Sequence, residues 1–372
     1  MTAGKSVLLE QRPALRAEVL LSAALRRGTA MVHLVKDPGS GQSFEVGVKE
    51  HFLMSRLDGS RTLAGIGEEY ARHFGRRLGE ANWRQLLGLL GERGLLEGAD
   101  PPTREPEQRP RATFVRGTLR LSADPARTVD RLHRAVGFVF SAPCAVPLVL
   151  LTLAMEATVA LRPAEFASGA GELLRQPVLL LGALTLLWVS TALHELAHGV
   201  VARRFGGSVT EIGLHWRLPV VFMYCKVDNY PYLPTRWAKV ATAGAGMFAN
   251  LVFLLPFALA RSLLPDGAQA RGPLAGLLLL GSVLALTNLV PVPPLDGYKA
   301  LSHALGMTDY AAQSRRFLRL LCARAVGHGP GAAGYPRGAR IAYAAYGLGV
   351  TALACGAVVG LAVLAHHLLT RG

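Results

Sequence analysis

Five long apolar stretches constrain the fold of this chain more than any other feature. Each contains at least 18 consecutive residues that lack Asp, Glu, Lys and Arg. They lie at 135–155, 176–202, 240–260, 272–292 and 341–365. Because an α-helix rises 1.5 Å per residue, about 20 residues cross the roughly 30 Å of hydrocarbon in a bilayer. We therefore predict a mainly α-helical, polytopic membrane protein with about five transmembrane helices.

The basic residues predict how these helices are oriented. Eighteen Lys and Arg lie in 116–134, just before the first stretch, in 203–239 and in 299–340, against five in the alternate connections and at the C-terminus. Basic residues concentrate on the cytoplasmic side of membrane proteins, so we expect the N-terminus inside and the C-terminus outside. Near the N-terminus, Glu10 and Arg12 interrupt the apolar core that a cleavable export signal needs. The expected location is the cell membrane, with a cytoplasmic head.

The net charge of +15 could also mark a nucleic-acid-binding protein. Its arginines, however, flank the apolar stretches, which is typical of anchoring at a membrane surface. We expect the lipid bilayer as a partner and no nucleic acid. The four cysteines are far apart and form no CxxC pair, so the sequence predicts neither a disulfide framework nor a thiolate metal site.

The first 98 residues have the composition of a soluble domain. Two β-prone runs at 30–36 and 43–48 flank a Pro and Gly-rich turn and predict a hairpin. Helical patterns follow at 49–57, 61–74 and 80–93. We predict a small α+β, winged-helix-like domain over 1–98. A Pro-rich, charged segment then begins a linker and membrane approach over 99–134, and the membrane domain occupies 135–372.

A candidate metal site lies near the end of the second apolar stretch, in the sequence HELAH. His194 and His198 are four residues apart, so on a helix they share one face and can hold one metal ion, while Glu195 can reach a metal-bound water. Ionisable groups inside a membrane helix are costly, which favours a functional role. A catalytic zinc ion needs a third protein ligand. Asp296 is our candidate, because prolines end the fourth stretch just before it and Gly297 allows close approach.

HELAH and NLVPVPPLDGYK together resemble the site-2 protease family of intramembrane zinc peptidases. The resemblance covers about 180–300 and implies a catalytic core over about 176–300, one Zn²⁺ per chain, His194, His198 and Asp296 as its ligands, and Glu195 as general base. Residues 117–134 resemble the approach segment of the family's peptide zinc metalloprotease branch. The family often has Gly-Pro-x-x-Asn in its middle core helix, and here the proline is missing from 246–250.

Two further asparagines, Asn250 and Asn288, lie in apolar stretches, where an amide without a partner is costly. Either residue could bind the backbone of a substrate or a developing oxyanion. A hydrogen bond between helices is an equally good explanation for both. The segment 207–234 is β-prone and resembles the sheet-like loop that follows the first core helix of the family, where an edge could receive substrate.

The head resembles PqqD-like domains, which bind leader segments of ribosomally synthesised, later modified peptides. The resemblance rests on the hairpin, on the sequence LDGSRT at 57–62 and on the leucine-rich last helix. It implies that a peptide adds a strand to the hairpin edge. Together, the two resemblances imply a zinc endopeptidase that removes a leader during peptide maturation. Regulatory cleavage of a membrane-anchored protein, a non-catalytic peptide receptor or immunity protein, and a zinc transporter are the alternatives, and the substrate, oligomeric state and any partner transporter stay open.

Overall fold

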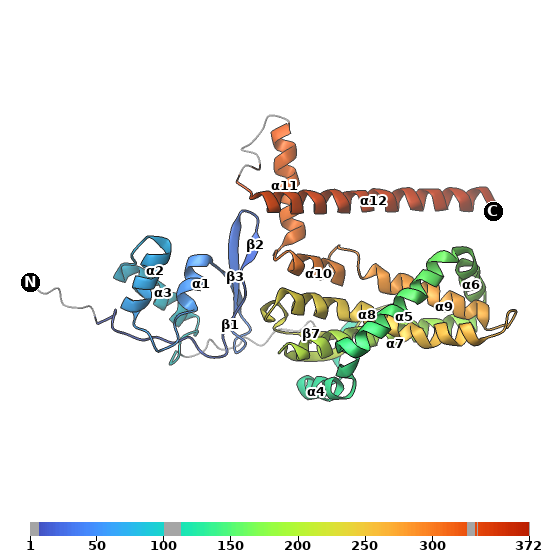
Figure 1. Cartoon of the computed structure of the whole chain (residues 1–372), viewed down its shortest axis with the longest axis horizontal. Coiled ribbons are helices and arrows are strands. Elements are labelled where there is room, and N and C mark those ends of the chain that lie inside the picture. Colours follow the sequence, from blue (N-terminus) through green and yellow to red (C-terminus); the bar gives the residue numbers. More distant parts are fainter. Residues whose placement is uncertain (1–6, 100–112, 326–331, 333, 372) are drawn as a thin grey trace, which may run out of the picture. The chain divides into compact units, whose positions relative to one another are not determined.

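The computed structural model describes residues 7–99, 113–325, 332 and 334–371, and over these residues the chain is mostly α-helical (Figure 1). It divides into two compact units, Met1–Arg109 and Pro110–Gly372. The first is a small unit that contains a sheet, and the second is a larger helical unit with a sheet of its own. The coarse prediction of an α-helical membrane protein with a small strand-containing N-terminal region is confirmed.

The first unit contains the predicted hairpin and its three helices. Its elements are β1 (Leu20–Leu21), β2 (Leu25–Arg27), β3 (Ala30–Lys36), β4 (Ser43–Gly47), α1 (Val48–Met54), α2 (Leu63–Phe74) and α3 (Glu80–Glu92). The hairpin strands β3 and β4 pair antiparallel, as predicted. Two short strands that the sequence pattern did not reveal, β1 and β2, pair with the opposite edge of β3. Among the described residues, β4 is therefore an edge strand and β3 a central one.

The helices of this unit bury one side of the sheet. Val35 of β3, Ile66 of α2 and Trp83 of α3 are almost fully buried in one core. The side chain of Thr62 accepts a hydrogen bond from the backbone N–H of Gly65 and so caps the start of α2. Every member of this core comes from the first unit, which therefore has its own hydrophobic core.

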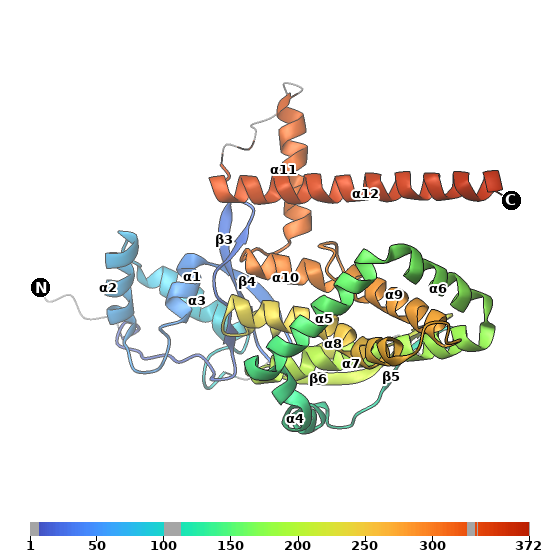
Figure 2. The same cartoon turned by 45° about the vertical axis from the view of Figure 1, so that its right-hand side comes forward.

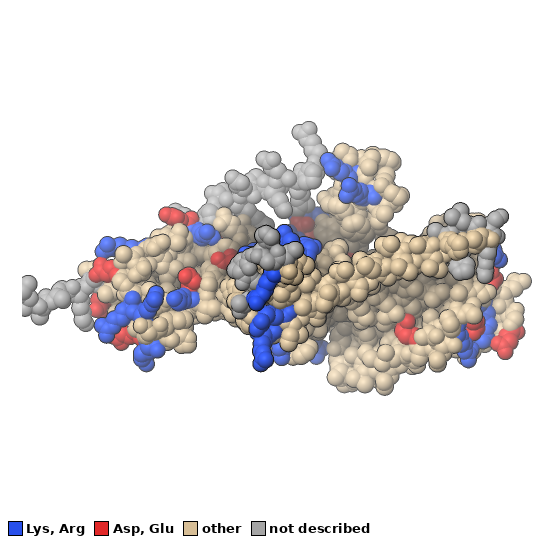
Figure 3. Space-filling model, turned by 90° about the horizontal axis from the view of Figure 1, so that it is seen from above, with Lys and Arg blue, Asp and Glu red and all other residues tan. Residues whose placement is uncertain are grey.

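The second unit contains long apolar helices that lie side by side (Figures 1 and 2). Its helices are α4 (Pro125–Val136), α5 (Ala142–Leu161), α6 (Pro163–Arg175), α7 (Pro177–Arg204), α8 (Arg236–Leu263), α9 (Arg271–Thr287), α10 (Asp296–Ala304), α11 (Tyr310–Ala325) and α12 (Arg337–Arg371), with short 3₁₀ helices at Gly137–Phe140 and Tyr230–Tyr232. By length and composition α5, α7, α8 and α12 can each cross a membrane, and α9 is a shorter apolar helix. Figure 3 shows a broad uncharged surface over such helices, with charged side chains gathered towards its ends.

Two predicted spans begin or end well inside their predicted bounds. The first was expected at 135–155, but α5 begins at Ala142, because Pro143 favours the first turn of a helix and the residues before Ser141 belong to α4 and a 3₁₀ turn. The fourth was expected to reach residue 292, but α9 ends at Thr287, since the prolines that follow cannot continue a helix. Helix α6, between the first two spans, was not predicted.

A second sheet lies beside α7. Strands β5 (Arg116–Arg120), β6 (Val209–Arg217) and β7 (Val220–Val227) pair in that order, all antiparallel. The β6–β7 hairpin confirms the β-prone pattern of 207–234. Strand β5 and helix α4 show that the predicted linker 99–134 contains folded elements; the sequence pattern missed β5 because its partner strand is remote in sequence. Residues 100–112 of that linker lie outside the described part of the chain.

Candidate metal centre

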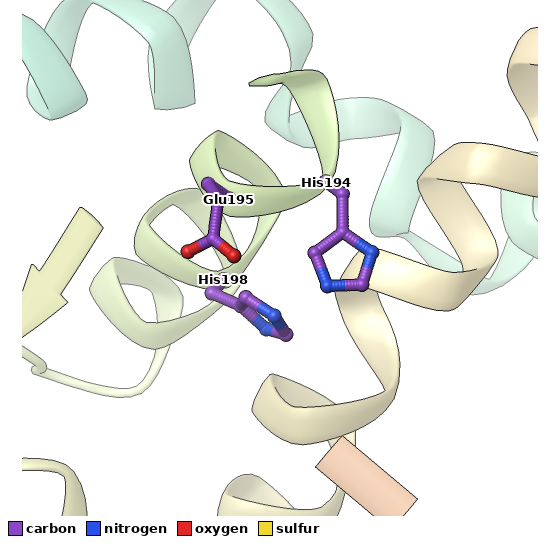
Figure 4. A group of neighbouring side chains, drawn as sticks. All are labelled: His194, Glu195 and His198. Carbon is purple, nitrogen blue, oxygen red and sulfur yellow. The ribbon is translucent and has the colours of Figure 1, made fainter. Parts of the chain in front are cut away.

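The centre is built on two antiparallel helices and one helix start. His194, Glu195 and His198 project from consecutive turns of α7, and Figure 4 shows their side chains directed to the same side. Potential ligand atoms of these three residues lie within 4.8 Å of one another. His194 is buried, and Glu195 and His198 are partly buried. The four-residue spacing of the histidines therefore brings them together as the sequence predicted.

Asp296 meets both histidines although it is about 100 residues away in sequence. Its Oδ2 atom lies 3.0 Å from Nε2 of His194 and 3.0 Å from Nε2 of His198. Asp296 is the first residue of α10 and is 8% exposed. Two imidazole nitrogens and one carboxylate oxygen thus converge on one point.

The backbone before Asp296 is held close to the end of α9. The N–H of Gly297 donates to the carbonyl of Asn288 at 2.7 Å. A Cβ atom at position 297 would lie only 2.1 Å from the carbonyl oxygen of Leu289. Only glycine permits this approach, as the sequence analysis anticipated, and the approach sets the position at which α10 begins.

Three contacts control the charge and orientation of the centre. Lys299 donates to Oδ1 of Asp296 at 2.8 Å, which leaves Oδ2 to face the histidines. Burial alone would raise the pKa of Asp296, but hydrogen bonds from His194 and His198 and the charge of Lys299 lower it below its ordinary value. On the other side, Nδ1 of His198 donates to the carbonyl of Thr242 at 2.7 Å.

The donor set fits a divalent metal ion. Because the Thr242 carbonyl can only accept, the proton of a neutral His198 must sit on Nδ1, and its Nε2 is then a lone pair. That lone pair faces the Asp296 oxygen, which is a second acceptor. Two acceptors this close require a cation between them, either a proton or a metal ion. Two imidazoles with one carboxylate, and a free glutamate beside them, form a set that zinc uses in catalytic sites.

The sheet borders the centre through β7. The indole Nε1 of Trp188 donates to the carbonyl of Val221 at 2.8 Å. Further along β7, Cys225 packs so close to Gly199 that a Cβ at 199 would lie 2.8 Å from its sulfur. Burial and the nearby Glu195 carboxylate raise the pKa of the Cys225 thiol to about 12. Strand β7 therefore runs along α7 past Glu195.

The two asparagines predicted near the site have different surroundings. Asn250 is 2% exposed and bonds across the helices, with its amide 3.1 Å from Nδ1 of His194. Asn288 donates to the carbonyl of Leu284 in its own helix. Sequence reasoning missed the contacts of Ser190, Thr242 and Lys299. A usable signal existed for Lys299, which lies three residues after Asp296 and so on the same helix face.

Comparisons with protein-family models, with curated proteins and with solved structures return no match for this chain.

Proposed function

We propose that this protein is a zinc endopeptidase that cleaves a peptide bond within or close to the membrane. The observation that carries the proposal is the convergence of His194, His198 and Asp296 on one point, with Glu195 beside them. The same convergence supports the resemblance to site-2 proteases. A zinc transporter would need the ligands but has no use for a glutamate at the general-base position.

His194, His198 and Asp296 would hold the ion. When bound, zinc would lower the pKa of a water molecule to about 7 and polarise the substrate carbonyl. Glu195 accepts a proton from the attacking water and returns it to the amine of the leaving product. Lys299 keeps Asp296 ionised and oriented.

We further propose five crossings, with the N-terminus in the cytoplasm and the C-terminus outside. The basic residues around the apolar helices support this orientation. Helix α7 ends at Arg204, and His198 and His194 precede it by six and ten residues. At 1.5 Å per residue, the site then lies roughly 9 to 15 Å below the cytoplasmic end of the helix.

The substrate we favour is a ribosomally made peptide that is cut during maturation. Two strand edges support an extended peptide: β4 in the first unit, and β7, which passes Glu195 in the second. Cleavage of a membrane-anchored regulator uses the same chemistry and is the second candidate within the protease class. A receptor or immunity protein that only binds peptide would not need Glu195.

The decisive experiment compares Glu195→Gln with His198→Ala in the purified full-length protein. Glutamine has nearly the same size as glutamate but cannot accept the proton, so E195Q should keep its zinc and lose about 10²–10⁴-fold in turnover. H198A should lose zinc affinity as well as activity, because it removes a ligand. The readouts are metal content and peptide products by mass spectrometry from cells with and without each variant.

Three outcomes would overturn the proposal. Normal cleavage by E195Q would remove the proposed proton transfer. Loss of zinc by E195Q would make Glu195 a ligand instead of a base. A wild-type protein that holds no zinc under any loading condition would exclude the function altogether.

A further inference from the structure

The helices α7 and α8 present two matching rows of residues to each other. Ser190, His194 and His198 follow one another at four-residue intervals on α7, and Asn250, Gly246 and Thr242 do so in reverse order on antiparallel α8. Each member contacts its counterpart: Ser190 donates to Asn250 at 3.0 Å, Gly246 packs on the His194 ring, and Thr242 accepts from His198. Helix α8 therefore touches both proposed histidine ligands on the side away from Asp296.

The middle contact leaves no room for a side chain. A Cβ atom at position 246 would lie 2.5 Å from three atoms of the His194 ring. Gly244, half a turn away on the same helix, has no atom within 4 Å of the corresponding position. The His194 ring is therefore confined between the two helices and cannot rotate freely.

A further contact across the helices, between Asn250 and His194, bears on the protonation of His194. A neutral imidazole carries one proton, on Nδ1 or on Nε2, and only a ring protonated at Nδ1 offers Nε2 to a metal. Nδ1 faces the side-chain amide of Asn250, which can present either its NH₂ group or its oxygen. With the NH₂ group towards Nδ1, as in the structure, Nε2 keeps the proton and donates to Asp296. With the oxygen towards Nδ1, Nδ1 carries the proton and Nε2 offers its lone pair to a metal ion.

The neighbouring residue permits both amide orientations. The Ser190 hydroxyl can donate to the amide oxygen or accept from the amide nitrogen, so it pairs with Asn250 in either case. Ser190, His194 and Asn250 are each buried, so bulk water does not compete for their hydrogen bonds.

We infer that Asn250 is a positioning residue: its amide turns its oxygen to Nδ1 of His194 when metal binds, and holds the ring with Nε2 aimed at the ion. Thr242 orients His198 in the same way, because its backbone carbonyl accepts the hydrogen bond from Nδ1. A carbonyl can only accept, so this contact needs no reorientation. Asn250 thus acts on the ligand and not on the substrate. This inference rests on the metal site of the proposed function.

The test measures Zn²⁺ affinity by chelator competition, and the visible spectrum of the Co²⁺-loaded protein, in Asn250→Asp and Asn250→Leu. Aspartate always presents an acceptor to Nδ1, so N250D should bind zinc at least as tightly as wild type, with a similar cobalt spectrum. Leucine has similar size but cannot accept, so N250L should bind zinc about 10–100-fold more weakly, with a changed cobalt spectrum, since outer partners of metal-bound histidines contribute about that much.

A matched pair of glycine variants provides a second, steric arm. Gly246→Ala should displace the His194 ring and weaken zinc binding, whereas Gly244→Ala on the same helix should leave it unchanged. Equal zinc affinity in wild type and N250L would overturn the inference, and so would a loss confined to kcat in N250L, which would assign the amide to the substrate. Failure of wild type to bind zinc would instead exclude the proposed function.

Discussion

At the scale of single residues, the first unit contains a stacked pair of histidines, of which His33 is buried and His51 is partly buried. His33 of β3 and His51 of α1 stack with ring centroids 3.5 Å apart, and Nδ1 of His33 is 2.9 Å from the carbonyl of Ser22. Burial, the neighbouring His33 and the charge of Arg56 lower the pKa of His51 to about 4. The stack holds this imidazole in its neutral form.

This pair predicts a pH dependence of stability. In the unfolded chain a histidine has a pKa of about 6.5, so acid favours the unfolded state, which binds the proton more readily. The stabilising effect is complete above about pH 6.5 and is lost as the pH falls towards 4. Between pH 7 and pH 5 the isolated first unit should lose about 1–2 kcal/mol of unfolding free energy, measured by urea denaturation. His51→Phe keeps a stacking ring without the titration, and an equal pH dependence in this variant would contradict the prediction.

At the scale of elements, α9 is the shortest of the five proposed membrane crossings, and a proposed metal ligand lies in the segment that follows it. It has 17 residues, which is about 25 Å and at the lower limit for a span. The segment that follows its last residue, Thr287, places Asp296 against His194 of α7. If α9 crosses, the connections before and after it lie on opposite sides of the membrane.

Reporter fusions can test this crossing. A chain truncated and fused after Asp266 should report the outer side, and one fused after Gly306 should report the cytoplasm, because only α9 separates them. The control is a fusion at the C-terminus, which should report the outer side again once α12 has been added. The same side for the first two fusions would make α9 a re-entrant helix.

Much of the element list follows from sequence patterns, and the exceptions have physical reasons. The hairpin of β3 and β4, helices α1 to α3 and the β6–β7 hairpin have local signals, and they were predicted. Strands β1, β2 and β5 are short and depend on partners elsewhere in the chain, so no local pattern reveals them. For the site, the HELAH spacing gave the histidines, but the contacts of Ser190 and Thr242 depend on the register of α7 against α8, which no single helix encodes.

At the scale of the whole molecule, the two units divide substrate capture and cleavage under the proposed function. Each has a core of its own, so removal of residues 1–98 should leave zinc content unchanged. Cleavage of a free peptide should fall by roughly 10²-fold, because capture by the head raises the local substrate concentration. Mass spectrometry of the products measures the effect.

A tethered substrate is the matched control for this deletion. When the peptide is fused directly to the second unit, the truncated protein should cut it as well as the full-length protein does. Equal cleavage of the free peptide with and without residues 1–98 would reduce the head to a structural role.

The three-stranded sheet also implies an order of events during synthesis. Arg120 of β5 pairs with Glu211 of β6, and 91 positions separate them in the chain. At about 5–20 residues per second, β5 leaves the ribosome several seconds or more before its partner strand exists. Helices α5, α6 and α7 are made in that interval. Sheet closure around α7 can therefore occur only after these helices have been synthesised, which makes it a late step in assembly.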